Sequence, residues 1–247
     1  MIIIIGSMID DILYFISKLK NKKEIIIFGK YKVYTGTILN RPVALISDIH
    51  TDYLTSALTA HLIEKFHALM IFVIGKTNSY SKDVKKGTIA ISRQIYLGDV
   101  NQIGIDKVQL GQIPTLPSFF LCDPYVASIV KNGALRIAPN NFTMCPFVST
   151  NTFNKTMEDI SSFTDTNTVF GHKGPVMIDN ETGGVAVAAE LYDIPFISIK
   201  VVEASVGERL TEEHMFDAYK NYPLIGKIVT YCIGEIGRND MLSDLDE

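Results

Sequence analysis

Uninterrupted apolar runs and amphipathic stretches alternate along the chain. The apolar runs at residues 2–5, 68–74 and 196–202 predict buried strands, and the last of them lacks the polar alternation of a half-exposed strand, which implies helices on both faces of a sheet. The amphipathic stretches predict helices. The predicted strands cover residues 2–5, 24–28, 31–37, 41–46, 68–74, 88–96, 134–138, 143–148 and 196–202. The predicted helices cover residues 8–19, 53–66, 123–130, 182–192 and 211–233. This order indicates an α/β sheet with helices above and below it.

Residues 176–205 combine a capped helix with an almost unbroken apolar strand. Asp179 and Asn180 are cap-type residues, and they place an acid, Glu181, at the start of the helix. A second acid, Glu203, follows the strand directly. Ligands of open α/β sheets bind at the carboxyl ends of the strands, so both acids are candidate site residues.

Length and composition limit the function classes. The chain has 247 residues, of which 47% are hydrophobic, which is enough for one domain with a substantial core. We expect that domain over residues 1–236 and a polar, acidic tail over residues 237–247. The net charge of −4 and the absence of a basic stripe argue against a nucleic-acid partner.

The cysteines and the first residues of the chain indicate the cellular compartment of the protein. Three cysteines lie far apart in the sequence, which favours reduced thiols and a cytoplasmic protein over a disulfide framework. Residues 1–5 are apolar but too short for a signal sequence or a membrane span, so no membrane partner is expected. The sequence suggests neither a cofactor nor a metal site. His61 and His67 do not share a helix face, and we interpret them as structural or surface residues.

Two nucleotide-binding motifs are incomplete. Gly75-Lys76-Thr77 resembles the end of a phosphate-binding loop, but Met70 stands where that loop needs its first glycine. No G-x-G-x-x-G follows a predicted strand, which argues against a dinucleotide-binding fold.

Two further residues have both a structural and a functional interpretation. Asp11 lies at a predicted helix start, where the helix dipole stabilises an anion, and a solvated helix-start acid is the simpler reading. Phe153 follows a polar turn and would suit stacking against a flat ligand, although a core aromatic is as good an explanation.

Several short motifs together resemble one enzyme family. They are the opening strand with Gly6, Ser7, Met8 and its acids, the loop at Ser47, the strand that ends at Gly75, the turn Gly111-Gln112-Ile113-Pro114 with Pro117 and Phe120, the pair Asp179 and Glu181 before an Ala-rich helix, and Pro195-Phe196. In order and spacing the chain is similar to the purine nucleoside phosphorylase and nucleosidase superfamily, most of all to the 5′-methylthioadenosine/S-adenosylhomocysteine nucleosidases. The resemblance implies a three-layer α/β/α fold with a central mixed, twisted sheet and a homodimer.

The resemblance also implies roles for particular residues. Asp11, where the family usually has Glu, would activate water, and Glu181 would bind the ribose hydroxyls. Phe153 would stack on the purine, with the backbone of Thr152 and Asn154 at its edge. The remaining substrate-binding candidates are Ile49 and Pro117 for the 5′ substituent (Pro117 lent by the partner subunit), Asn180 in place of the usual Met, and Lys76.

The chain departs from the family pattern at the leaving base. Counted from Pro195, the base-protonating Asp of the family falls on Ala204, and Glu203 lies one residue earlier. Successive strand side chains point to opposite faces, so Glu203 would reach the site only if the strand end bulges. Loss of a general acid costs about 10²- to 10⁴-fold in rate, which would leave weak or absent activity.

Three functions therefore remain open. The first is a nucleosidase that hydrolyses the N-glycosidic bond of an adenine nucleoside, with Glu203 as its rearranged general acid. A phosphorylase is less favoured because Gly6 stands alone, without a Gly-x-Gly-Arg phosphate site. The second is a weakened homologue that binds a nucleoside or nucleotide without cleaving it, with Lys76 favouring a phosphate. The third is a scaffold role on the same fold. Adenine release distinguishes the first from the others, and ligand binding distinguishes the second from the third.

Overall fold

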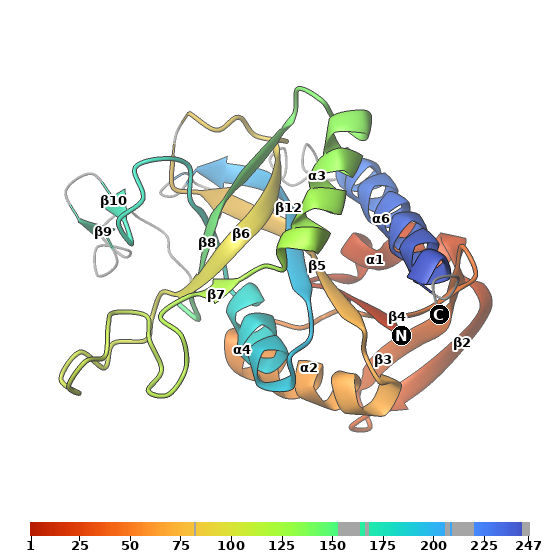
Figure 1. The fold of residues 1–247 in the computed structure, drawn as a ribbon, viewed down its shortest axis with the longest axis horizontal. Helices are drawn as coiled ribbons and strands as arrows, with labels where there is room; N and C mark the ends of the chain where they lie inside the picture. Colours follow the sequence, from red (N-terminus) through yellow and green to blue (C-terminus); the bar gives the residue numbers. More distant parts are fainter. Residues whose placement is uncertain (82, 153–163, 166–167, 206–207, 209–219, 244–247) are drawn as a thin grey trace.

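A large mixed sheet forms the centre of the molecule, with helices on both sides (Figure 1). The computed structural model describes residues 1–81, 83–152, 164–165, 168–205, 208 and 220–243. The helices are α1 (Ile9–Lys18), α2 (Asp52–Phe66), α3 (Pro124–Ile137), α4 (Thr182–Tyr192) and α6 (Tyr222–Ser243). The strands of the large sheet are β1 (Ile2–Gly6), β2 (Lys20–Ile27), β3 (Tyr31–Ile38), β4 (Arg41–Ile46), β5 (Met70–Ser79), β6 (Ile89–Leu97), β7 (Phe120–Leu121), β8 (Phe142–Ser149), β11 (Met177–Asp179) and β12 (Phe196–Ser205). Two short strands, β9 (Thr164–Asp165) and β10 (Thr168–Val169), pair separately.

The sheet partly closes on itself. Its order is β11-β8-β6-β12-β5-β1-β4-β3-β2, with β7 paired to β6. The short strand β11 pairs with β8 in parallel and also with the end of β5 in antiparallel orientation. Five strands therefore form a closed ring, in which β5 and β12 run in the opposite direction to β6, β8 and β11.

The helices cover the two faces of the sheet. Figure 1 shows α2 and α4 on one side and α1, α3 and α6 on the other. Between them, every residue of β12 is buried, as the unbroken apolar pattern predicted. The predicted fold, a three-layer α/β/α structure with a mixed central sheet, is confirmed.

Two local predictions are wrong. The predicted strand at residues 134–138 belongs to α3, because Gly133 and Ala134 are buried helix positions and Gly133 lies against Ile228 and Tyr231 of α6. The polar stretch after Gly75, which resembled a loop, continues β5 as far as Ser79 because it pairs with β12 and β11.

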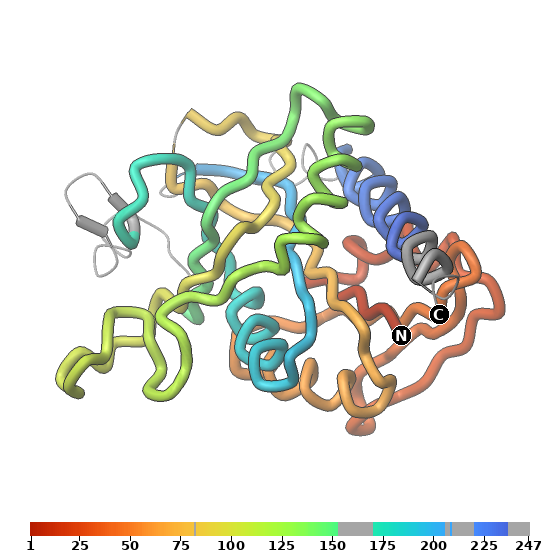
Figure 2. Tube along the Cα trace, viewed as in Figure 1, coloured from red at the N-terminus to blue at the C-terminus, as the bar shows by residue number. Residues whose placement is uncertain are grey.

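The last helix and the loop after β6 can also be compared with the predicted elements. The predicted start at residue 211 lies outside the described residues, and α6 continues through most of the expected tail to Ser243. Residues 98–119 leave the sheet as a long loop, as predicted for residues 97–109 (Figure 2). Among the described helices, none is long and apolar enough to cross a bilayer.

Candidate active site

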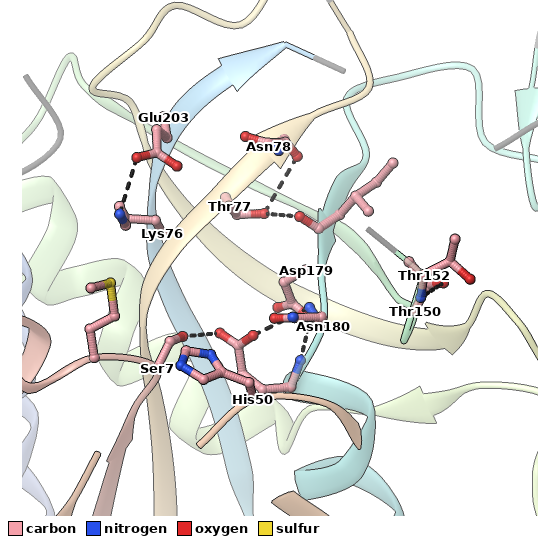
Figure 3. A pocket seen from close by; sticks show the side chains of 13 residues that line it. Ser7, His50, Lys76, Thr77, Asn78, Thr150, Thr152, Asp179, Asn180 and Glu203 are labelled. Carbon is pink, nitrogen blue, oxygen red and sulfur yellow. Dashed lines mark hydrogen bonds and ion pairs between the residues drawn. The ribbon is translucent and has the colours of Figure 1, made fainter. Parts of the chain in front are cut away.

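A cavity of about 220 Å³ opens at the carboxyl ends of the central strands (Figure 3). It is built from residues that follow or end β1, β4, β5, β8, β11 and β12. The lining residues are Ser7, Met8, His50, Lys76, Thr77, Asn78, Thr150, Thr152, Ile178, Asp179, Asn180, Glu181 and Glu203. This is the position at which α/β sheets bind ligands.

Glu181 lies at the floor of the cavity and is held by several donors. It is the N-cap residue of α4, so the start of the helix fixes its backbone. The Ser7 hydroxyl and the Lys200 ammonium both donate to Oε1, and the Asn180 backbone N–H lies 3.3 Å from Oε2. A buried carboxylate fixed in this way is preorganised to accept hydrogen bonds from a ligand.

Lys200 neutralises two carboxylates inside the core. Its side chain is fully buried, and its Nζ lies 2.7 Å from Oδ2 of Asp179 in addition to its bond with Glu181. Burial alone would lower the lysine pKa, but the two carboxylates outweigh burial and raise it, so the ammonium stays charged. Asp179 also accepts from the backbone N–H of Thr182 at 3.2 Å, so its side chain caps the first turn of α4 although the N-cap position is Glu181.

Asp11 lies beside this cluster but does not line the cavity. Its Oδ2 accepts the Met8 backbone N–H at 2.8 Å. Burial raises the Asp11 pKa to about 6; a hydrogen bond from Tyr222 and the Met8 N–H oppose the increase, whereas the charge of Glu181 adds to it. Gly75 makes room for this arrangement: a Cβ there would lie 3.0 Å from Asp11 Oδ2, and its φ of +146° disfavours other residues.

Glu203 faces the cavity because the strand bulges at that residue. Along β12, Val202 pairs with Thr77 and Ala204 pairs with Asn78, so Glu203 is the extra residue. Its Oε1 lies 3.1 Å from Nζ of Lys76, which comes from β5 (Figure 3). Ala204 is fully buried and is not among the cavity-lining residues. The bulge thus supplies the condition under which Glu203 could reach the site, although its catalytic role stays a prediction.

A further buried acid, Asp52, lies next to Asp179. Ser149 lies between Asp52 and Asp179, with its Oγ 2.8 Å from Oδ1 of Asp52 and 2.9 Å from Oδ1 of Asp179. A hydroxyl has one proton, so one of the two carboxyl groups must carry a proton for both contacts to be favourable. Burial raises the Asp52 pKa to about 7, and the charge of Asp179 adds to the increase, so Asp52 can hold this proton below about pH 7.

Only some of the other predicted site residues line the cavity. Thr152, Asn180 and Lys76 line the cavity, whereas Ile49 is fully buried next to the lining residue His50. Pro117 is exposed on the long loop and lines no part of this cavity. Phe153 and Asn154 lie outside the described residues.

Sequence reasoning missed several residues of the site, and four of them are polar groups that bear on its chemistry. They are Ser7, His50, Asn78 and Lys200. Lys200 had a visible signal, because a lone lysine in an apolar strand needs buried acids to pair with it. Within the described part of the chain, no group of His, Cys, Asp and Glu residues could hold a metal ion.

Comparison with known proteins gives one consistent result. The family model of the phosphorylase superfamily matches residues 1–234. The 5′-methylthioadenosine/S-adenosylhomocysteine nucleosidase of Maridesulfovibrio salexigens is 24% identical over 207 residues, which cover 83% of this chain and 86% of that protein.

Solved structures share the fold at lower identity. The nucleosidase of Neisseria meningitidis in complex with methylthio-immucillin-A has a TM-score of 0.84 and 21% identity, and the match covers 94% of this chain and 97% of the other. The futalosine hydrolase of Helicobacter pylori has a TM-score of 0.83 and 18% identity, with 95% and 97% coverage. At these identities, the structures establish the fold and not the substrate.

Proposed function

The chain belongs to the phosphorylase superfamily, and from this premise we propose that it is an N-ribosyl hydrolase. The substrate would be an adenine nucleoside such as 5′-methylthioadenosine or S-adenosylhomocysteine. The observation that carries the proposal is the Glu181 carboxylate, which Ser7 and Lys200 hold at the floor of a cavity. Relatives that are nucleosidases by name support the same reaction class.

The proposed reaction breaks the bond between the sugar carbon C1′ and the purine nitrogen N9. Glu181 accepts hydrogen bonds from the ribose hydroxyls, and these strengthen as positive charge develops on the sugar. Asp11 takes a proton from the attacking water. Glu203 and its ion-pair partner serve the leaving base, where protonation of N7 lets the base depart.

Release of free base from methylthioadenosine, adenosylhomocysteine and adenosine tests this function. We expect release without added phosphate, and we expect Glu181→Gln to lower kcat/KM by about 10²- to 10⁴-fold. Glu190→Gln is the matched control, since Glu190 is an exposed acid on the same helix. A correctly folded parent protein that releases no base from any of the three would refute the proposal.

A second candidate is a homologue that binds the nucleoside without cleaving it. It is favoured by Asp11, whose carboxylate lies beneath the cavity instead of lining it. Because Asp is one methylene shorter than the usual Glu, its water would be poorly placed, at a cost of roughly 10²-fold. Calorimetric binding of adenine nucleosides without turnover would support this alternative.

We also propose a cytoplasmic homodimer. Pro117 is exposed on the long loop between β6 and β7, where it is available to a partner subunit. The three cysteines are buried free thiols, which suits a reducing compartment. Sedimentation analysis tests the dimer, and fractionation of cells tests the location.

A further inference from the structure

The ion pair of Lys76 and Glu203 is the polar feature of the cavity that the family pattern does not explain. The two side chains come from neighbouring strands and meet at 3.1 Å. They are 15% and 9% exposed, so they are shielded from bulk water but open to a ligand. In Figure 3 they lie above Ser7, on the opposite side of Asp179 from Thr150 and Thr152.

This position is the leaving-group end if the proposed function holds, on which the inference rests. With the ribose at Glu181 on the cavity floor, we place the base toward Lys76 and Asn78, which line the same cavity. A carboxylate paired with an ammonium has no proton to give, whereas the ammonium has three. The proton donor at this end is therefore the lysine and not the glutamate.

We propose that the Lys76 ammonium hydrogen-bonds to N7 of the purine and protonates it as the base leaves. The C1′–N9 bond breaks, its electron pair moves into the base, and N7 takes a proton from Nζ. Water supplies the oxygen at C1′ and gives its proton to Asp11. Solvent at the cavity mouth then returns a proton to Lys76. Glu203 stays ionised throughout and is a positioning residue that holds the ammonium in place.

Asn78 provides an independent indication of a ligand at this end. It follows Lys76 by two residues on β5, so both side chains lie on the same face of the strand, and both line the cavity. Its Oδ1 is buried without a hydrogen-bond partner among the described residues. A buried acceptor of this kind calls for a donor. Adenine carries an N6 amino donor beside N7, so the Lys76 end matches that edge of a 6-aminopurine.

The turnover test compares two leaving groups. We expect Lys76→Met to lower kcat/KM for adenosine by about 10²- to 10⁴-fold, because N7 loses its proton donor. The same variant should retain most of its activity on p-nitrophenyl β-D-ribofuranoside, because nitrophenolate leaves without a proton. Lys86→Met is the matched control: Lys86 pairs with Glu208 at 3.3 Å outside the cavity. Equal losses on both substrates would overturn the proposal.

A binding test remains informative even if the parent protein has no turnover. By calorimetry, adenine should bind about tenfold or more tightly than 7-deazaadenine, which lacks the N7 acceptor. Lys76→Met should remove that difference, and Lys86→Met should keep it.

The outcomes separate the two proposals. Base release that is unaffected by Lys76→Met leaves the hydrolase proposal standing and overturns the role of Lys76. An N7-dependent affinity that requires Lys76, without any base release, supports the contact and refutes the hydrolase. Equal affinity of the parent protein for adenine and 7-deazaadenine overturns the contact.

Discussion

Two lysine–carboxylate clusters lie at the carboxyl ends of the same central strands, and they differ in burial and in partners. Lys200 is 0% exposed and binds two acids, Asp179 and Glu181, which are 1% and 2% exposed. Lys76 is 15% exposed and pairs with Glu203 at the cavity. In the first cluster the ammonium is sealed beneath two carboxylates that line the cavity, whereas in the second both members of the pair line the cavity.

The difference shows how the same chemistry serves two purposes. A sealed ion pair is costly to desolvate and is tolerated because every charge has a fixed partner, so it holds Glu181 in one geometry. A pair at a cavity wall keeps access to a ligand and to solvent protons. Lys200 therefore prepares the site, whereas Lys76 is positioned to take part in the reaction.

Among the predictions that test this comparison, the largest effect is expected from substitution of Lys200. Lys200→Met leaves two carboxylates in the core without their cation, and breaking a buried pair in this way costs about 3–5 kcal/mol. We expect the free energy of unfolding, measured with urea at neutral pH, to fall by that amount or the protein to fail to fold. Lys76→Met is the control, and its stability should change much less because its partner reaches the cavity. Similar losses in the two variants would contradict the distinction.

The same two clusters show what the sequence could predict. Helix α4 has the predicted bounds because Asp179 caps it and its alanines favour a helix. Glu181 was found because a helix start fixes its position locally. Glu203 could not be placed, because the bulge depends on how β12 pairs with β5, which is a long-range property. Lys200 was overlooked because its strand was classified by its apolar neighbours.

Asp11 lies beside the Lys200 cluster, and we predict that its carboxylate is the base that activates water. The proposed base must be ionised and burial raises its pKa to about 6, so kcat/KM should fall as the pH drops below about 6. Asp11→Asn should lower kcat/KM by about 10²- to 10⁴-fold at pH 8. Asp10→Asn is the control, since Asp10 is the neighbouring acid on the same helix. A pH profile that is flat between 5 and 8 would exclude Asp11 as the base.

Asp11 also marks a limit of sequence reasoning. Its position at a helix start was clear, and a solvated acid was the simpler reading. The structure buries it against Gly75, and Tyr222 lies within hydrogen-bonding reach. Nothing local in the sequence predicts that contact, because Gly75 and Tyr222 come from β5 and α6.

The smallest effect is expected one layer below, at Asp52, whose Oδ2 is buried without a hydrogen-bond partner in the described part of the chain. Its pKa is raised from 3.8 to about 7 by burial and by the charge of Asp179. The folded state therefore binds this proton more tightly than the unfolded state does. The resulting stabilisation is complete below about pH 4 and is lost as the pH rises to 7.

Asn cannot ionise, so Asp52→Asn should remove this loss. We expect the variant to be more stable than the parent protein at pH 8 and the gain to shrink at pH 5. Asp99→Asn is the matched control because Asp99 is an exposed neighbour. An equal decrease in the free energy of unfolding of Asp52→Asn at both pH values would contradict the prediction. It would mean that Asp52 is ionised beside Asp179, so that neither carboxyl group bound to Ser149 carries a proton. An increase in the free energy of unfolding at pH 8 alone would instead show that Asp52 and Asp179 share one proton in the folded protein.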